Sequence, residues 1–253
     1  MNARIIASSI ALAASSHVSF AATFFDDFNR SDSPNVGNGW FTMNQSVPGP
    51  QLQIANDQLT LLSPRPMAGV FRPFLLSGSV EVGVAMTETS GFDGLARRYD
   101  QYVWVFNDGT IGDGYGLNII RGDQNYSDSR VTLTDGAATI GTLNSTFQFG
   151  PQIYLDATFN LDGSVTGTLS QPGASFTFSF GPHAIQSVGG SFAIAMSGPD
   201  GRSSSFIYPT MDNVSIASVP ELSTFGMLLM GLLGIGSVGC YNKGNAFSTK
   251  ART

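Results

Sequence analysis

Three aromatic side chains at alternating positions are the strongest candidates for chemistry in this 253-residue chain. Tyr102, Trp104 and Phe106 fall on one face of a predicted strand, and Val103 and Val105 fall on the other. An exposed aromatic ring can stack on a sugar ring, so Tyr102 and Trp104 are the candidate ligand-binding residues. The alternative is that these rings belong to the core, which is the commoner use of aromatic residues.

Acidic and amide side chains in glycine-rich segments offer oxygen ligands, which suit calcium. The candidate metal ligands are Asp123, Asn125 and Asp128, whose spacing partly imitates an EF-hand loop. That loop would need Gly at its sixth position and Glu at its twelfth, and the chain has Asp128 and Thr134 there. The alternative is ordinary turn formation by Asp and Asn. No cofactor is predicted, and calcium is the one metal ion that these residues would suit.

Groups for acid–base or nucleophilic catalysis are scarce. Glu81 and Glu88 are seven positions apart, so on a strand they would be over ~20 Å apart and on opposite faces. His183 follows Gly181-Pro182 and is interpreted as a surface residue in a loop rather than a catalytic base. There is no Gly-x-Ser-x-Gly motif. The sequence leaves pairs of aspartates open, but otherwise it favours a protein without catalytic activity.

Composition limits the elements that can position these residues. The chain is 42% hydrophobic, which excludes a disordered protein, and it has only 3 Glu and 2 Lys, which disfavours a helical one. Residues 22–219 hold 8 Arg, no Lys and 17 acids, and they contain no basic stripe. Nucleic acid is therefore excluded as a partner.

The hydrophobic pattern of the middle of the chain has a period of two, which indicates strands with one buried face. Examples are the alternating apolar residues of segments 80–86, 153–159 and 176–180. Turn sequences such as Asn107-Asp108-Gly109 separate about twelve such runs. We therefore predict an all-β domain over residues 22–218, a sandwich of two antiparallel sheets.

Both ends of the chain have the features of targeting segments. Residues 1–21 contain Arg4, a short apolar run and small residues before a cleavage site after Ala21, which is typical of a signal peptide. Near the other end, Phe225–Tyr241 is an uncharged run long enough for a short transmembrane helix. Residues 243–253 are basic, so the domain is predicted to be exported and held in the inner membrane by this helix.

The segment 219–253 begins with the residues Val219, Pro220, Glu221, Leu222, Ser223 and Thr224. This order of motif, apolar span and basic end resembles the PEP-CTERM sorting signal of Gram-negative bacteria, although Leu222 stands where a second proline is usual. The resemblance implies that an exosortase-type membrane protease processes the chain. It also implies a destination in the cell envelope or extracellular matrix. The alternative is a simple C-terminal anchor.

The domain itself opens with Phe25-Asp26-Asp27-Phe28-Asn29-Arg30, followed by Gly39-Trp40, and closes with Met211-Asp212-Asn213-Val214. These ends resemble those of exported concanavalin A-like lectin/glucanase domains. The resemblance implies a jelly roll whose first strand, within residues 23–29, pairs antiparallel with its last, within residues 208–217.

Retaining glucanases of this superfamily carry a Glu-x-Asp-x-x-Glu strand, and two of its carboxylates perform the hydrolysis. A motif that began at Glu81 would need Asp at position 83 and Glu at position 86. The chain has Gly83 and Met86 there, so the motif is absent. We therefore predict a non-enzymatic surface or matrix protein that binds extracellular polysaccharide. The alternatives are a glycan-active hydrolase on the same fold and an anchored adhesin with a protein partner.

Overall fold

The computed structural model describes residues 23–43, 51–61, 67–74, 78–88, 99–121, 129–198 and 209–219, which form fifteen β-strands. These residues include no helix, and therefore none that is long and apolar enough to cross a membrane. The signal peptide with Ala21, the predicted helix 225–241 and the sorting residues after Val219 lie outside the described residues. Val219 itself is the last residue of the last strand.

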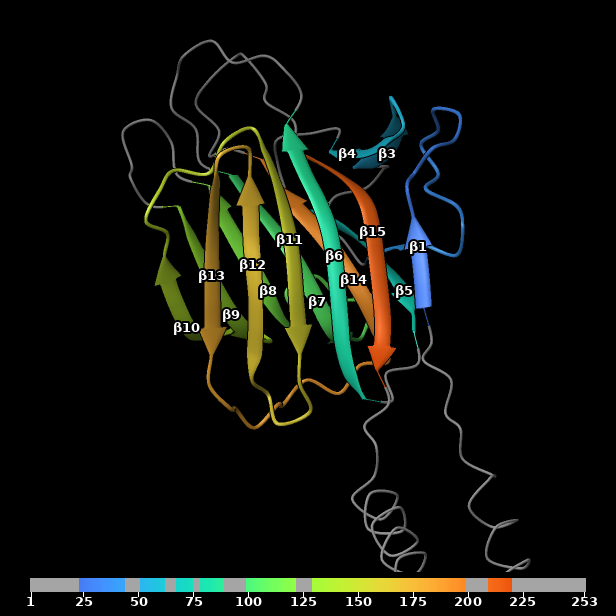
Figure 1. Ribbon diagram of the computed structural model, residues 1–253. Coiled ribbons are helices and arrows are strands. Elements are labelled where there is room, and N and C mark those ends of the chain that lie inside the picture. The colour runs from blue at the N-terminus through green and yellow to red at the C-terminus, as the bar shows by residue number, and fades with distance from the viewer. Residues whose placement is uncertain are drawn as a thin grey trace, which may run out of the picture. The chain divides into compact units, whose positions relative to one another are not determined.

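One sheet has eight strands and runs in the order β13-β12-β11-β6-β15-β4-β3, with β1 also paired to β15 (Figure 1). Its strands are β1 (Thr23–Asp26), β3 (Leu52–Ala55), β4 (Gln58–Leu61), β6 (Ser79–Glu88), β11 (Gln152–Phe159), β12 (Val165–Gln171), β13 (Ala174–Phe180) and β15 (Pro209–Val219). All of its strand pairs are antiparallel.

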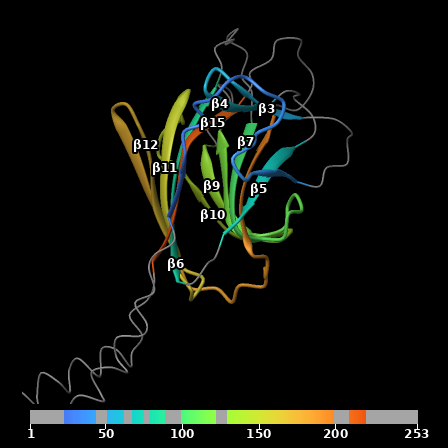
Figure 2. The same ribbon diagram turned by 90° about the vertical axis from the view of Figure 1, so that its right-hand side faces the viewer.

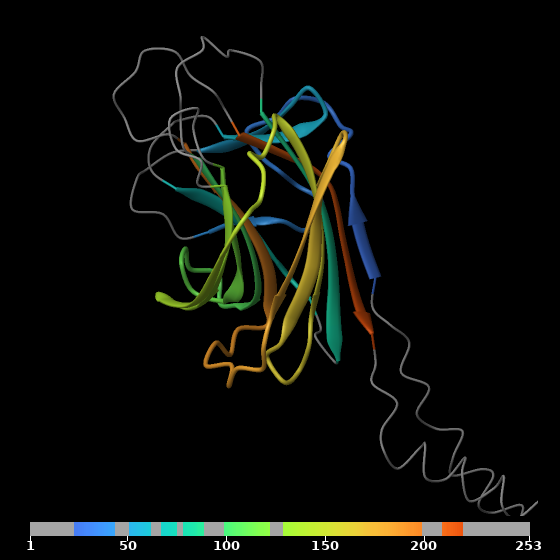
Figure 3. The ribbon, with the colours of Figure 1, turned by 60° about the vertical axis from the view of Figure 1, so that its left-hand side comes forward.

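The second sheet has seven strands in the order β10-β9-β8-β7-β14-β5-β2. Its strands are β2 (Phe41–Thr42), β5 (Ala68–Pro73), β7 (Tyr99–Asn107), β8 (Tyr115–Arg121), β9 (Arg130–Asp135), β10 (Ala138–Asn144) and β14 (Ser191–Ser197). Figures 2 and 3 show the two sheets as layers that face each other. The predicted two-sheet antiparallel sandwich is confirmed.

The space between the sheets is filled by the residues that the period-two pattern predicts. Val80, Val82 and Val84 of β6 are at most 2% exposed, and so are Ile153 and Leu155 of β11. They belong to one apolar cluster that draws on both sheets. The alternate residues of these strands point outward, because successive side chains of a strand point to opposite faces. A binding surface on these strands is therefore built from their outward positions.

The first and last strands pair as predicted. Residues of β1 lie antiparallel to β15 in a register that runs from Thr23 opposite Ala217 to Asp26 opposite Val214. In Figure 1, β1 lies beside β15 at the edge of the eight-stranded sheet. This pairing fixes the start of the domain to a strand that is itself held by β6 on its other side.

A buried carboxylate holds the segment that follows β1. The Asp26 carboxylate is 2% exposed and accepts hydrogen bonds from the Arg30 guanidinium (2.7 and 3.1 Å), Trp40 Nε1 (2.8 Å) and Asn38 Nδ2 (3.0 Å). The backbone N–H of Phe28 donates a further bond of 2.8 Å. Burial by itself would raise the pKa of Asp26, but these hydrogen bonds, led by the one from Arg30, bring it below its ordinary value.

Candidate functional site

The predicted aromatic pair lies on the outer face of the seven-stranded sheet. Val103 and Val105 of β7 point into the core between the sheets, and Tyr102 and Trp104 point the other way. The two rings stack with centroids 5.0 Å apart and planes at 24°. Trp104 is only 2% exposed, because it packs in a second, smaller apolar cluster. The buried members of that cluster are Met43, Trp104, Ala193 and Ala195.

Because Trp104 is almost fully buried, its ring serves packing rather than ligand binding. A buried ring face cannot stack on a sugar. Tyr102 is half-buried, and its hydroxyl donates to Asp100 Oδ2 at 3.1 Å. Its ring packs against the smaller cluster from the outside. The buried Trp104 ring therefore holds the Tyr102 ring by stacking against it. The binding role of Tyr102 stays a prediction.

Phe106 does not share the face of Tyr102 and Trp104, so that part of the sequence prediction is wrong. A β-bulge interrupts the pairing of β7 with β14, where Trp104 lies opposite Ala193 but Asn107 lies opposite Ser191. The extra residue on β7 leaves Phe106 with a φ of 54° and turns its ring toward the core between the sheets. A bulge of this kind reverses the alternation on which the prediction depended.

Strand register places a row of polar side chains beside Tyr102. Asn118 of β8 lies opposite Tyr102, Thr132 of β9 lies opposite Asn118, and Thr142 of β10 lies opposite Thr132. Residues directly opposite each other in neighbouring antiparallel strands point to the same face of a sheet. The row therefore continues the outer face from the aromatic pair toward the edge strand β10.

These polar side chains line a hollow of about 430 Å³, which we call the threonine hollow. Its lining residues are Asn118, Ile120, Arg130, Thr132, Thr134, Thr139 and Thr142. Thr132 and Thr134 alternate with the buried Val131 and Leu133, so the same period of two that fills the core also presents the hydroxyls outward. Sequence reasoning missed this hollow, because its residues come from three strands that only the register brings together.

Two groups in the threonine hollow have unused hydrogen-bonding capacity. The side-chain oxygen of Asn118 is buried and has no hydrogen-bond partner among the described residues. The half-buried guanidinium of Arg130 makes no hydrogen bond or ion pair to any residue that the structure describes. A buried polar atom without a partner is costly, and a ligand or a water molecule can supply the missing bond.

The lining residues of the threonine hollow offer groups that can recognise a ligand by hydrogen bonding. Its seven lining residues offer hydroxyls, an amide and a guanidinium, and none of them is a carboxylic acid. Cleavage of a glycosidic bond by the usual route needs two placed carboxyl groups. An Arg guanidinium, by contrast, presents a planar set of donors that matches a carboxylate.

His183 lies away from the threonine hollow, in the segment between β13 and β14, where it contacts Asp135 at the end of β9. Its Nε2 atom is 3.3 Å from Asp135 Oδ2. Asp135 also accepts bonds from Ser187 Oγ (2.6 Å), the Ser187 N–H (3.0 Å) and the Gln186 N–H (2.7 Å). Burial would raise the pKa of Asp135, but these hydrogen bonds, with the one from Ser187 Oγ the strongest, lower it. Ser187 bonds to the aspartate and not to the histidine, so the three do not form a nucleophile–base pair, and the cluster fastens this segment to β9.

The predicted metal ligands Asp123, Asn125 and Asp128 lie outside the described residues. Within the residues that the structure describes, no group of three or more His, Cys, Asp or Glu side chains is arranged to hold a metal ion. Of the other acids in glycine-rich turns, Asp108 accepts a hydrogen bond from the Thr110 N–H at 2.8 Å, which is ordinary turn chemistry. The calcium site stays a prediction.

No protein-family model matches the chain, and no curated protein matches it in sequence. Solved structures do match its fold. An acidic lectin of winged bean, complexed with methyl-α-D-galactose, aligns with a TM-score of 0.55 and 11% identity over 80% of this chain and 100% of the lectin. Peanut lectin aligns with a TM-score of 0.55 and 9% identity over 79% of this chain and 98% of its own.

The carbohydrate recognition domain of Emp47p aligns with a TM-score of 0.53 and 15% identity, over 80% of this chain and 99% of that domain. These neighbours are legume-type and related lectins with the concanavalin A-like jelly roll. The fold that the two ends of the sequence predicted is therefore confirmed. At such low identity, the likeness concerns the fold alone.

Proposed function

We propose that the chain is an exported, non-enzymatic polysaccharide-binding protein that binds its ligand in the threonine hollow. The observation that carries the proposal is that two groups, the Asn118 oxygen and the Arg130 guanidinium, have no hydrogen-bond partner among the described residues. The lining residues of the hollow include no carboxylate. Hydroxyls of a sugar would bond to Asn118 and the threonines. A ligand carboxylate would pair with Arg130, so the preferred polymer contains uronic acid.

Tyr102 would add an apolar surface at the side of the hollow, because it lies directly opposite Asn118 on the neighbouring strand. Its hydroxyl is already engaged with Asp100, which fixes the orientation of the ring. The lectin fold of the chain's structural neighbours, one of which is complexed with a galactose derivative, agrees with this use of the sandwich.

Export and sorting form the second part of the proposal. The sequence supports it with the signal peptide 1–21, the motif Val219, Pro220, Glu221, Ser223 and Thr224, the apolar span 225–241 and the basic end. An exosortase-type protease would cut near Pro220 and deliver the domain from the inner membrane to the envelope or matrix of a Gram-negative bacterium. Mass spectrometry of the mature protein tests this, since an intact tail 243–253 would show a permanent anchor instead.

Affinity electrophoresis of the full chain in mild detergent tests the binding site. In gels that contain alginate, a polymer of uronic acids, we expect Arg130→Gln and Asn118→Ala each to weaken retention at least about tenfold, which is the effect of losing one hydrogen bond to a charged group or one buried acceptor. Thr177→Val, an exposed change on the other sheet, is the matched control and should behave as the wild type. Folded variants with unchanged retention would contradict the proposal.

A further inference from the structure

The outer face of the eight-stranded sheet contains a second concavity, of about 580 Å³, which we call the aromatic groove. The outward side chains among its lining residues come from β1, β6, β11 and β15. They are Thr23, Phe25, Glu81, Gly83, Ala85, Tyr154, Asp156, Asn213, Ser215 and Ala217. This face is opposite the one that carries the threonine hollow, because the core separates the two sheets (Figure 2).

The floor of the aromatic groove is low because its central residues are small. Gly83 lies opposite Asp156 of β11 on one side and Ser215 of β15 on the other. Two more small residues are close to it on this face: Ala85, two positions along β6, and Ala217, two positions beyond Ser215 on β15. A Cβ atom at position 83 would come within 2.5 Å of Ser215 Oγ, so any other residue would raise the floor or displace Ser215. Beneath the floor, the neighbouring residues of β6 are fixed in the core.

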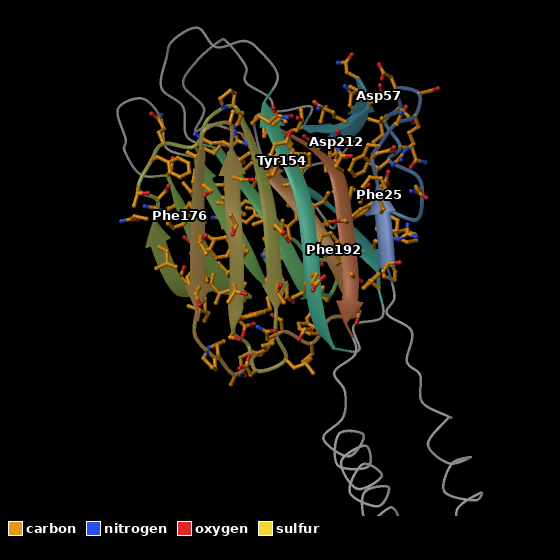
Figure 4. The ribbon with its side chains drawn as sticks, viewed as in Figure 1. Phe25, Asp57, Tyr154, Phe176, Phe192 and Asp212 are labelled. Carbon is orange, nitrogen blue, oxygen red and sulfur yellow. The ribbon has the colours of Figure 1, made fainter. Side chains whose placement is uncertain are left out.

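Two exposed aromatic rings stand at the two sides of this floor. Phe25 of β1 is 58% exposed and Tyr154 of β11 is 44% exposed, and the strands β6 and β15 lie between them (Figure 4). Three steps of about 4.8 Å between strands separate the two backbones by roughly 14 Å across the sheet. Gln152 donates a hydrogen bond of 2.6 Å to the Tyr154 hydroxyl, which helps to fix its ring. The spacing suits a short run of linked sugar rings better than a single sugar.

The charge of the aromatic groove determines which sugars fit it. Glu81 and Asp156 line the groove with exposed carboxylates, and no Lys, Arg or His is among its lining residues. Ionised carboxylates only accept hydrogen bonds, so the ligand must donate them, as sugar hydroxyls do. An acidic polysaccharide would be repelled. This is the reverse of the threonine hollow, where the charged lining residue is Arg130.

We propose that the aromatic groove binds a neutral polysaccharide chain, which lies across β11, β6, β15 and β1. Sugar rings stack on Tyr154 and Phe25, and their hydroxyls donate to Glu81 and Asp156. The groove acts independently of the threonine hollow, because the two share no lining residue. Together with the threonine hollow, whose binding role rests on the proposed function, the groove would give the molecule one glycan site on each face. Such a molecule would hold two polysaccharide chains together and cross-link a mixed matrix.

Isothermal titration of the full chain in mild detergent with cellohexaose and laminarihexaose, two neutral glucose hexamers, tests the groove. We expect Tyr154→Ala and Phe25→Ala each to weaken binding about tenfold, the effect of losing one aromatic contact. Gly83→Val should abolish binding by filling the floor. Tyr154→Phe keeps the ring and should bind within about twofold of the wild type, and every variant should melt within a few degrees of it.

The outcomes separate this site from the threonine hollow. The proposal for the groove is wrong if the wild type binds neither hexamer, or if Tyr154→Ala binds as well as the wild type. Either result counts whatever Arg130→Gln does to alginate retention. Loss of hexamer binding in Tyr154→Ala, with alginate retention intact, supports it. That second result holds even if Arg130→Gln shows the threonine hollow to be unused.

Discussion

The two outer faces of the sandwich rest on the same inner packing but carry different chemistry. The threonine hollow presents a guanidinium, an amide and hydroxyls over β8, β9 and β10. The aromatic groove presents two exposed rings and two carboxylates over β1, β6, β11 and β15. Inward residues must fill the core, whereas packing constrains the outward ones less, apart from Trp104 and its small cluster. Each sheet can therefore develop its own ligand preference without any change in the fold.

Each outer face also depends on one buried group that lies close to it. Substitution of that group should have the largest effect on the face. Trp104 supports the side of the seven-stranded sheet that carries Tyr102. We expect Trp104→Ala to lower the free energy of unfolding by about 3–5 kcal/mol, because it leaves a cavity in a packed cluster. Denaturant unfolding measures this. Tyr154→Ala, at an exposed ring, is the control and should cost less than about 1 kcal/mol. A Trp104→Ala variant as stable as the wild type would restore the interpretation of this ring as a binding surface.

The corresponding group for the aromatic groove is Asp26, which follows Phe25 in the chain. Asp26→Asn should lower the free energy of unfolding by about 3 kcal/mol, because the Arg30 guanidinium loses its charged partner. Binding of cellohexaose should weaken in the same variant while retention on alginate persists, since β1 is not part of the other sheet. Asp27→Asn, the adjacent exposed residue, is the matched control for the denaturation measurement. Equal stability of the two variants would show that the Asp26 bonds contribute little.

The pH dependence of stability should also differ between the two sheets, with smaller effects of opposite sign from Asp135 and Asp212. The folded pKa of Asp135, on the seven-stranded sheet, is lowered, so its contribution to stability is present above the unfolded pKa of about 4 and is lost as the pH falls through the folded value. Asp135→Asn should therefore cost about 2 kcal/mol at pH 7 and flatten the loss of stability in acid. Asp212 of β15 differs, because burial first, and then repulsion by Asp26, Asp27 and Asp57, raises its pKa.

The contribution of Asp212 is fully present below its unfolded pKa and is lost as the pH rises through the folded value. Figure 4 shows Asp212 and Asp57 at the same end of the eight-stranded sheet. Asp212→Asn should leave stability at pH 7 unchanged or raise it by up to about 0.5 kcal/mol. Thermal unfolding of both variants between pH 3 and pH 7 decides the signs. Parallel pH profiles for the two variants would contradict this assignment.

The core could be predicted from the sequence because its signal is local. An alternation such as Val80, Val82, Val84 specifies a buried face without knowledge of the neighbouring strands, and the ends of the chain suggested which strands would pair. Phe106 could not be predicted in the same way. A bulge adds one residue whose position depends on the partner strand β14, and the alternation beyond it is reversed.

The candidate sites depended on long-range register, which a single sequence does not contain. Phe25 and Tyr154 are far apart in the chain, and only the order β11-β6-β15-β1 places them on one groove. The same holds for Asn118 and Thr142 in the threonine hollow. Tyr102 was placed on the correct face, but whether Trp104 was exposed depended on Met43, which lies in a different segment.

The pairing of β15 on both sides has a mechanical consequence. The register runs from Pro209 opposite Glu88 to Val219 opposite Ser79 on one side, and from Val214 opposite Asp26 to Ala217 opposite Thr23 on the other. If the chain is tethered just beyond Val219, as it would be in the membrane-held form before the proposed cleavage near Pro220, a pull from a bound polysaccharide acts along this strand. Its hydrogen bonds are then loaded in shear, many at once, instead of being opened one after another. The domain would therefore resist tension best in the direction in which a matrix would pull it from the cell.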